Sequence, residues 1–240
     1  QIRFFRNKGD GTFTDYTEIS GLKGVTGGLN LTQGDFNNDG FVDFAILRGG
    51  WKYLPEWGIL PNSLIQINGD GTFTDVTIAA GMYSVRPCKT AVWLDFNADG
   101  WLDIYISRYG WFEEPEDRVN RLFINNKDNT FTEKAKEYGL DNTGYSIQST
   151  FFDYDKDGDL DLFVGNQPTH VRNTKALQEN NPPPMDANVS DRLFRNNGDN
   201  TFTIENVPSG TAATASVTDF NNCSASLALP AVNCDCPEVL

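Results

Sequence analysis

The stretch DFNNDGFVDFAI, which begins at Asp35, returns as DFNADGWLDIYI from Asp95 and as DYDKDGDLDLFV from Asp153. Acidic or amide side chains occupy positions 1, 3, 5 and 9 of each copy, and glycine occupies position 6. The interval between the copies is nearly constant, which indicates a protein built from internal repeats.

A second motif recurs in step with the first. It reads NKGDGTFTD at 7–15, NGDGTFTDV at 68–76, NKDNTFTEK at 126–134 and NGDNTFTIE at 197–205. In the first three repeats its aspartate (Asp10, Asp70 or Asp128) precedes the acidic motif by 25 residues. Because the two motifs keep a fixed phase, we treat the repeat as a structural unit.

Each repeat contains four segments with the pattern of β-strands. In the second repeat, an apolar segment at 89–96 leads into the acidic motif, and a segment of alternating apolar and polar residues follows at 101–108. Alternation rich in aromatic and β-branched residues is typical of strands. A third segment, NRLFINN, turns through Asp-Asn into a fourth, TFTEKA. The sequence predicts an all-β protein of four-stranded antiparallel blades, with a turn of helix only at TEKAKEYG (132–139).

The order of these motifs resembles the FG-GAP (VCBS) repeat of integrin α-subunit propellers. The added element NRLF-x-N, followed by TFT, more closely resembles propellers of the cartilage acidic protein type, and DLFVGNQP (161–168) is similar to the closing FG-GAP signature. The resemblance covers about residues 1–220 and implies an extracellular, calcium-containing β-propeller. Such propellers have seven blades, whereas this chain holds about four blades' worth of strands. We therefore expect part of a larger propeller; the alternative is a four-bladed closure completed by N-terminal strands.

The predicted repeats lie near residues 1–27, 28–88, 89–145 and 146–210, with a partial repeat at 211–222 and a divergent cysteine-containing tail at 223–240. A degenerate acidic motif begins at Asp219, where Cys223, Ser224 and Leu227 replace the third acid, the glycine and the last acid. We expect no calcium in this fourth copy.

The acidic motif has the ligand chemistry of a calcium loop. Calcium prefers about six to eight oxygen ligands, and a tight loop brings side chains 1, 3, 5 and 9 and the carbonyl of position 7 to one centre. Three calcium sites are predicted. Their ligands are Asp35, Asn37, Asp39, the Phe41 carbonyl and Asp43; Asp95, Asn97, Asp99, the Trp101 carbonyl and Asp103; and Asp153, Asp155, Asp157, the Asp159 carbonyl and Asp161. Gly40, Gly100 and Gly158 allow the sharp turn.

Three other interpretations of the acidic motif fit the sequence less well. An EF-hand needs a glutamate at position 12 and flanking helices, but that position holds Ile46, Ile106 or Val164 within strand-like sequence. Copies on different blades cannot converge on one substrate atom, which argues against a catalytic cluster. A metal-free acidic turn would bring several like charges together, which disfavours their ionisation.

The composition limits the remaining classes of function. The net charge of −14 argues against nucleic acid as a partner. No apolar run approaches the roughly 20 residues that span a bilayer, and with His170 as the single histidine no nucleophile–base pair is evident, so we expect no enzyme. A disulfide from Cys223 to Cys234 or Cys236 would suit an oxidising compartment.

The loops between the second and third strands should leave the blades opposite the calcium loops. They contain six aromatic residues: Trp51, Tyr53, Trp57, Tyr109, Trp111 and Phe112. Exposed aromatics on loops suggest a surface that recognises protein or carbohydrate, and the alternative is that they cap the blade cores.

The function expected is therefore a secreted or cell-surface, calcium-stabilised propeller that binds protein or glycan, with calcium in a structural role. The alternatives are a non-catalytic accessory domain or subunit of an extracellular enzyme or surface assembly, and, with less support, an enzyme that acts on glycans through the aromatic face.

Overall fold

The computed structural model describes residues 2–25, 27–48, 60–109, 114–167, 190–206, 213–218 and 224–229. The chain forms two compact units, residues 1–204 and 205–240. The predicted disulfide, the degenerate loop from Asp219 to Cys223, His170 and five of the six loop aromatics lie outside the described residues.

Almost all regular structure is β-strand. Sixteen strands and one 3₁₀ helix are described: β1 (Phe5–Asn7), β2 (Phe13–Asp15), β3 (Asn30–Gly34), β4 (Asp43–Leu47), β5 (Ser63–Ile67), β6 (Phe73–Asp75), β7 (Cys88–Leu94), β8 (Asp103–Arg108), η2 (Pro115–Arg118), β9 (Arg121–Asn125), β10 (Phe131–Glu133), β11 (Ser146–Phe152), β12 (Asp161–Asn166), β13 (Arg192–Asn196), β14 (Phe202–Asn206), β15 (Ala213–Thr218) and β16 (Ser224–Leu229). No helix among the described residues is long and apolar enough to cross a lipid bilayer.

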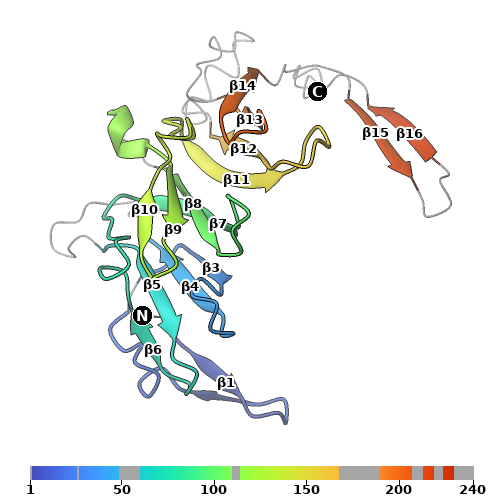
Figure 1. The fold of residues 1–240 in the computed structure, drawn as a ribbon. Helices are drawn as coiled ribbons and strands as arrows, with labels where there is room; N and C mark the ends of the chain where they lie inside the picture. The colour runs from blue at the N-terminus through green and yellow to red at the C-terminus, as the bar shows by residue number, and fades with distance from the viewer. Residues whose placement is uncertain are drawn as a thin grey trace, which may run out of the picture. The chain divides into compact units, whose positions relative to one another are not determined.

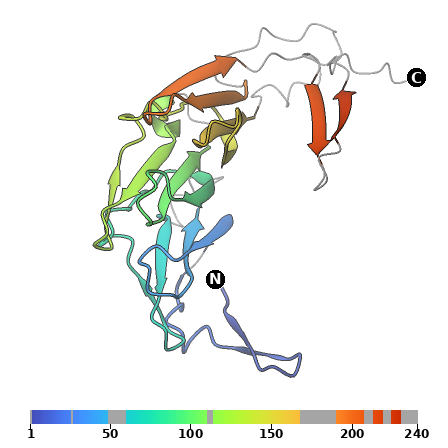
Figure 2. The ribbon, with the colours of Figure 1, turned by 45° about the vertical axis from the view of Figure 1, so that its right-hand side comes forward.

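The strands form three four-stranded antiparallel sheets, β3–β6, β7–β10 and β11–β14, in which consecutive strands pair (Figure 1). Two hairpins, β1–β2 and β15–β16, form separate two-stranded sheets. The predicted all-β fold of four-stranded, propeller-like blades is therefore confirmed. The three sheets follow one another in chain order (Figure 2). We call the sheets β3–β6, β7–β10 and β11–β14 blades one, two and three.

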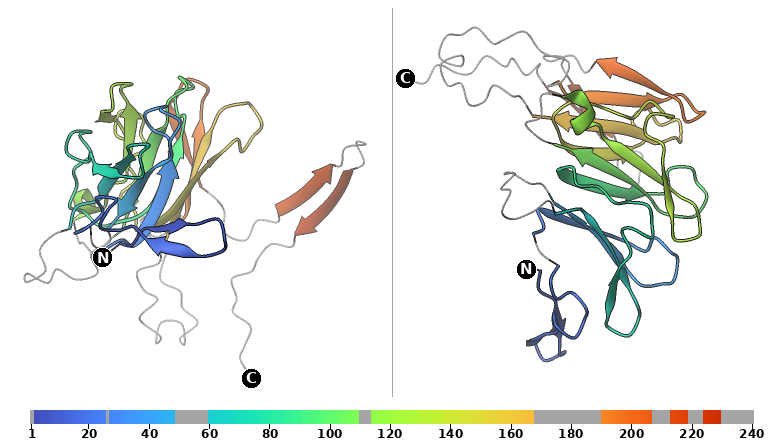
Figure 3. Two further views of the ribbon diagram at one scale, coloured as in Figure 1. Left: turned by 90° about the horizontal axis from the view of Figure 1, so that it is seen from below. Right: turned by 90° about the vertical axis from the view of Figure 1, so that its left-hand side faces the viewer.

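Within each blade the acidic motif connects the first strand to the second. Strand pairing sets the aspartate at position 9 of the motif opposite the residue immediately before position 1. Gly34 pairs with Asp43, Leu94 with Asp103 and Phe152 with Asp161. The turn between the third and fourth strands leaves the same end of the sheet. In the right-hand view of Figure 3, both kinds of turn lie along one side of the blades.

The predicted turn of helix within TEKAKEYG is a single turn in the structure, and it is not unique to that repeat. The amide of Tyr138 donates to the carbonyl of Lys134, as Ser20 does to Tyr16 and Ala80 to Val76. The one described helix lies instead at Pro115–Arg118, where proline occupies the first turn and acidic residues follow it. Proline has a fixed φ suited to this position, a signal that the repeat pattern alone does not supply.

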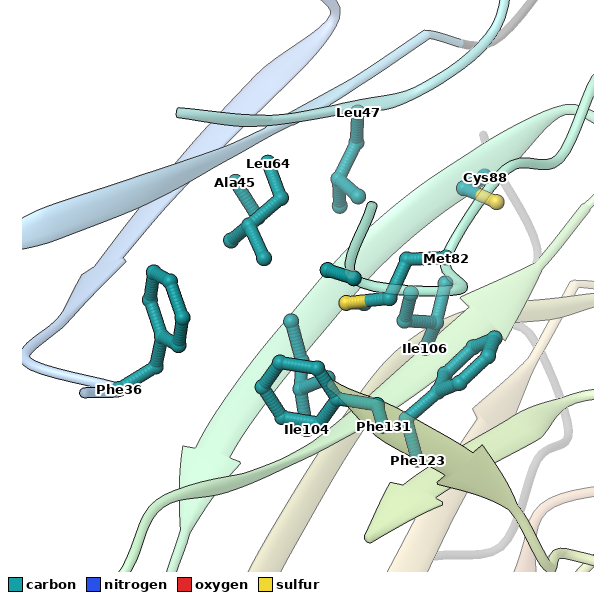
Figure 4. Packing of buried hydrophobic residues seen from close by; sticks show 11 residues of the cluster. Phe36, Ala45, Leu47, Leu64, Met82, Cys88, Ile104, Ile106, Phe123 and Phe131 are labelled. Carbon is teal, nitrogen blue, oxygen red and sulfur yellow. The ribbon is translucent and has the colours of Figure 1, made fainter. Parts of the chain in front are cut away.

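The hydrophobic core lies between neighbouring blades. Blades one and two enclose a cluster of Phe36, Ala45, Leu47, Leu64, Ala80, Met82, Cys88, Ile104, Ile106, Phe123 and Phe131 (Figure 4). Blades two and three enclose a second cluster that contains Phe96, Tyr105 and Leu162. The aromatic residue at position 2 of the first two acidic loops, Phe36 or Phe96, is buried here, which ties each loop to the core.

Backbone hydrogen bonds also join consecutive repeats. The amide of Phe73 donates to the carbonyl of Ser20 at 2.8 Å, and the amide of Phe131 donates to the carbonyl of Ala80 at 2.9 Å. Gly21 and Gly81 follow these acceptors with φ of +82° and +75°. A Cβ at Gly21 would lie 2.9 Å from the Phe73 carbonyl oxygen, so glycine is needed there for both conformation and space.

Candidate metal centres

The three acidic loops share one backbone conformation. Position 4 has φ of 54° at Asn38, 54° at Ala98 and 65° at Lys156, and position 6 is glycine with φ between 84° and 97°. Two left-handed residues two positions apart fold the chain back sharply, and only glycine adopts such angles without cost. The loop glycine predicted to permit this turn does have the required conformation.

Backbone amides hold the carboxylates at positions 1 and 5. In loop one, Asp35 accepts hydrogen bonds from the amides of Asp39 at 3.1 Å and Gly40 at 2.9 Å. In loop two, the amide of Trp101 donates to Oδ1 of Asp99 at 2.9 Å. In loop three, the amide of Asp159 donates to Oδ1 of Asp157 at 3.0 Å. These bonds orient the carboxylates toward the inside of the loop. The second oxygen at position 5 is contacted by side chains: Oδ2 of Asp39 accepts from Nδ2 of Asn37 at 2.8 Å, and Oδ2 of Asp99 lies 3.2 Å from Nζ of Lys127.

The aspartate at position 9 is fully buried in all three loops. Its Oδ1 accepts from the backbone of the third strand: from Ile67 at 2.8 Å for Asp43, from Asn125 at 2.7 Å for Asp103, and from Asn196 at 2.8 Å for Asp161. This carboxylate therefore links the acidic loop to the third strand of its own blade.

The second oxygen of this aspartate differs between blades. Oδ2 of Asp103 accepts from the amide of Phe96 at 2.9 Å, and Oδ2 of Asp161 accepts from Tyr154 at 2.7 Å. Oδ2 of Asp43 is buried and accepts no hydrogen bond of normal geometry from the described residues, although the amide of Phe36, equivalent to Phe96 and Tyr154, faces this carboxylate and favours its charged form. A buried carboxylate oxygen without a partner is costly, and a cation in the loop would remove that cost.

Two of these aspartates have strongly raised pKa values. Burial raises the pKa of Asp43 to about 6, and the charges of Asp39 and Asp35 add to the effect, against the backbone amides of Ile67 and Phe36, which lower the pKa. Burial likewise raises the pKa of Asp103 to about 6, with added repulsion from Asp99 and Asp95. Loops that raise the pKa of their own carboxyls disfavour negative charge unless a positive charge is present.

Loop three brings the predicted ligands closest to a metal-binding arrangement. Carboxylate oxygens of Asp153, Asp155 and Asp161 all lie within 4.8 Å of one another. Burial and the charges of Asp157 and Asp161 raise the pKa of Asp155. All donors here are oxygens, which fits calcium better than the nitrogen and sulfur ligands that zinc prefers.

The opposite end of the blades is described only in part. Tyr109 was predicted to be an exposed aromatic, but its side chain is 9% exposed and Lys89 lies over its ring, with Nζ 5.8 Å from the ring centroid. For this residue the structure favours the alternative, a core-capping role, because it follows directly on the buried strand β8. The prediction for the other five aromatics stays open.

The sequence motifs missed a set of amide side chains that organise the loops. Nδ2 of Asn125 donates to the carbonyls of Phe36 at 2.8 Å and Leu102 at 3.1 Å, so one amide joins loops one and two. Nδ2 of Asn196 donates to the carbonyl of Leu160 at 3.3 Å. The signal was present in the repeated NN of NRLFINN and DRLFRNN, which resembles ordinary turn composition.

Comparison with known proteins agrees with this architecture. The sequence model of the FG-GAP-like repeat matches residues 1–46 and 95–164. The chain is 30% identical over 190 residues to cartilage acidic protein 1 of Xenopus tropicalis, an alignment that covers 74% of this chain and 27% of the relative. It is 28% identical over 164 residues to cartilage acidic protein 1 of Homo sapiens, covering 67% and 23% of the two chains.

The chain thus spans about a quarter of the length of the curated relatives it matches. The matched residues contain all three acidic loops and the hairpin β1–β2, and they leave out strands β5, β6 and β7. Repeat pattern, blade structure and similarity agree: the chain carries FG-GAP-like repeats on propeller-like blades.

Proposed function

We propose that the three acidic loops bind calcium and that calcium stabilises the blades of an extracellular binding module. The side chains at positions 1, 3, 5 and 9 and the carbonyls of Phe41, Trp101 and Asp159 would hold the ions. Calcium would supply the positive charge that the clustered carboxylates lack, and no chemical step is assigned to it.

The observation that carries this proposal is the unpartnered Oδ2 of Asp43, a fully buried carboxylate oxygen at the inner side of an acidic loop. Unpaired buried charge is rare in proteins because its desolvation is not compensated. The grouped carboxylates of Asp153, Asp155 and Asp161 support the same conclusion in blade three.

A structural role for the ion follows from the connections of the loops. The position 9 aspartate is bonded to the third strand, and the position 2 aromatic residue of loops one and two packs in the core between blades. An ion held by these loops would therefore clamp the first three strands of each blade. Because ion binding occurs in the folded state, it would raise the free energy of unfolding.

Equilibrium dialysis and thermal melting test the proposal together. We expect three calcium ions per chain and a melting temperature that falls by several degrees when a chelator is added. A chain that binds no calcium, or that melts at the same temperature with and without chelator, would contradict it.

The similarity to cartilage acidic protein 1 supports an extracellular, adhesion-type role rather than catalysis. We propose that the partner is a protein or carbohydrate bound at the end of the blades opposite the acidic loops. Alanine at Trp51 or Trp111 should weaken capture of such a partner without changing the melting temperature. Unchanged binding to every captured protein and to a glycan array would remove this surface as the binding site.

A further inference from the structure

The turn between the third and fourth strands of blade two contains an unusual residue. The position of Lys127 is occupied by glycine in the equivalent turns, at Gly9, Gly69 and Gly198. All four residues have positive φ: 66° at Lys127 and 80° to 85° at the three glycines. A lysine is poorly suited to this conformation, so its presence calls for a compensating contact.

That contact is with loop two. Nζ of Lys127 lies 3.2 Å from Oδ2 of Asp99. Oδ1 of Asp99 already accepts the amide of Trp101, so the lysine binds the oxygen that position 5 would offer to a metal. The amide of Lys127 donates to Oδ1 of Asn125 at 2.9 Å, which holds the turn in place beside the loop.

The other two loops lack this arrangement. In blade one the equivalent residue, Gly69, has no side chain that could reach Asp39. In blade three the equivalent is Gly198, and the nearest cation recorded at that loop, Nη1 of Arg195, lies 3.9 Å from Oδ2 of Asp155. Loop three also has a fourth acidic side chain among its predicted ligands, at position 3.

We propose that Lys127 is a tethered cation that competes with calcium for Asp99, so that loop two binds calcium most weakly of the three. This inference rests on the proposed calcium function. Calcium must displace the ammonium group from Asp99 and is repelled by it, which lowers the affinity. The same ammonium partly neutralises loop two in the absence of calcium, so this loop depends least on the ion for its structure.

The test measures the three calcium dissociation constants of the chain by equilibrium dialysis with radioactive calcium. Lys127→Gln removes the charge at similar side-chain length, and Lys127→Gly restores the residue of the other turns. We expect both variants to lower the largest dissociation constant by up to about fivefold, the upper end expected for loss of one partly exposed ion pair. The matched control is Lys134→Gln, since Lys134 is paired at 3.1 Å with Glu137 rather than with an acidic loop.

The assignment to loop two is tested by adding Asp99→Asn. In chains that carry Asp99→Asn, the measured calcium dissociation constants should be the same whether residue 127 is lysine or glutamine. The inference is overturned if both Lys127 variants behave as Lys134→Gln does, or if the tightening persists beside Asp99→Asn, while the wild type still binds three ions. If the wild type binds no calcium, the proposed function itself fails, and this inference fails with it.

Discussion

Blades one and two carry nearly the same acidic motif on the same backbone, yet their loops differ in chemistry. In blade two, both oxygens of Asp103 accept backbone hydrogen bonds, and Lys127 pairs with Asp99. In blade one, Oδ2 of Asp43 accepts no hydrogen bond of normal geometry within the described structure, and Gly69 stands in place of the lysine. The motif therefore determines the shape of the loop and the burial of its last aspartate, whereas residues outside the motif, such as Lys127, determine which cations lie beside its carboxylates.

The largest expected effect compares the position 9 aspartates. Asp103→Asn turns one acceptor into a donor that faces a backbone amide, of Phe96 or of Asn125, and should lower the free energy of unfolding by about 3 kcal/mol in chelator. In Asp43→Asn the NH₂ can take the place of Oδ2, which accepts no hydrogen bond of normal geometry, so its cost should be smaller, about 1 kcal/mol. Urea denaturation in chelator measures both values. Equal losses of unfolding free energy in the two variants would show that the position 9 aspartates of the two blades are hydrogen-bonded equally well.

The amide that joins the two loops gives the next largest effect. Asn125→Ala leaves the carbonyls of Phe36 and Leu102 without their side-chain donor, which should cost about 2 kcal/mol. Blade one has Ile67 at the equivalent position, and Ile67→Ala serves as a packing control. The calcium affinity of loops one and two should weaken together in Asn125→Ala. Weakening at loop two alone would show that the amide does not connect the blades.

The pH dependence in the absence of metal should reveal the raised pKa of Asp43, a property that Asp103 of loop two shares. The pKa of Asp43 is raised to about 6 from an ordinary value of 3.8, so the folded state binds more protons than the unfolded state between these values. Its contribution to stability is complete below about pH 4 and is lost as pH rises through 6, by about 1 kcal/mol after allowance for solvent screening. In chelator, wild type should lose stability from pH 5 to 7.5 relative to Asp43→Asn. Parallel pH profiles would contradict the raised pKa.

The smallest expected effect is at the direct contact between the two loops. Nδ2 of Asn38 donates to the carbonyl of Gly100 at 3.0 Å, and Ala98 cannot make the corresponding bond in loop two. Asn38→Gly keeps the left-handed conformation and removes only the side chain, so we expect a loss of about 0.5 kcal/mol. Thermal melting at saturating calcium measures it. A loss of unfolding free energy as large as that of Asn125→Ala would contradict the expectation that an exposed hydrogen bond contributes little to stability.

Much of the fold could be predicted because the same strand and turn pattern occurs in several copies along the chain. Alternating segments such as 101–108 and the fixed phase of the two motifs predicted the four-stranded blades and the end at which the acidic loops lie. Loop residues such as Asp103 and Gly100 could be assigned from spacing within the motif, because local turns depend on near neighbours in the chain.

The differences between the loops could not be predicted in the same way. The partner of Asp43 is the amide of Ile67, 24 residues along the chain, and nothing in either motif indicates whether the second oxygen is satisfied. The pairing of Lys127 with Asp99 requires the turn of one hairpin to lie beside the loop of another. The sequence left open whether Tyr109 is exposed or caps the core, because it stands at the border of a loop and a strand; in the structure it continues the burial of β8.

The bonds from Phe73 to Ser20 and from Phe131 to Ala80 bear on how such a chain grows by gene duplication. Each bond joins the fourth strand of one repeat to the turn that ends the preceding repeat. A duplicated segment that runs from one such turn to the next carries both a donor and an acceptor, so it can be inserted without leaving either neighbour incomplete. Every whole repeat therefore brings the acceptor that precedes its glycine and the donor in its fourth strand, so each added copy forms the same contact with its neighbour.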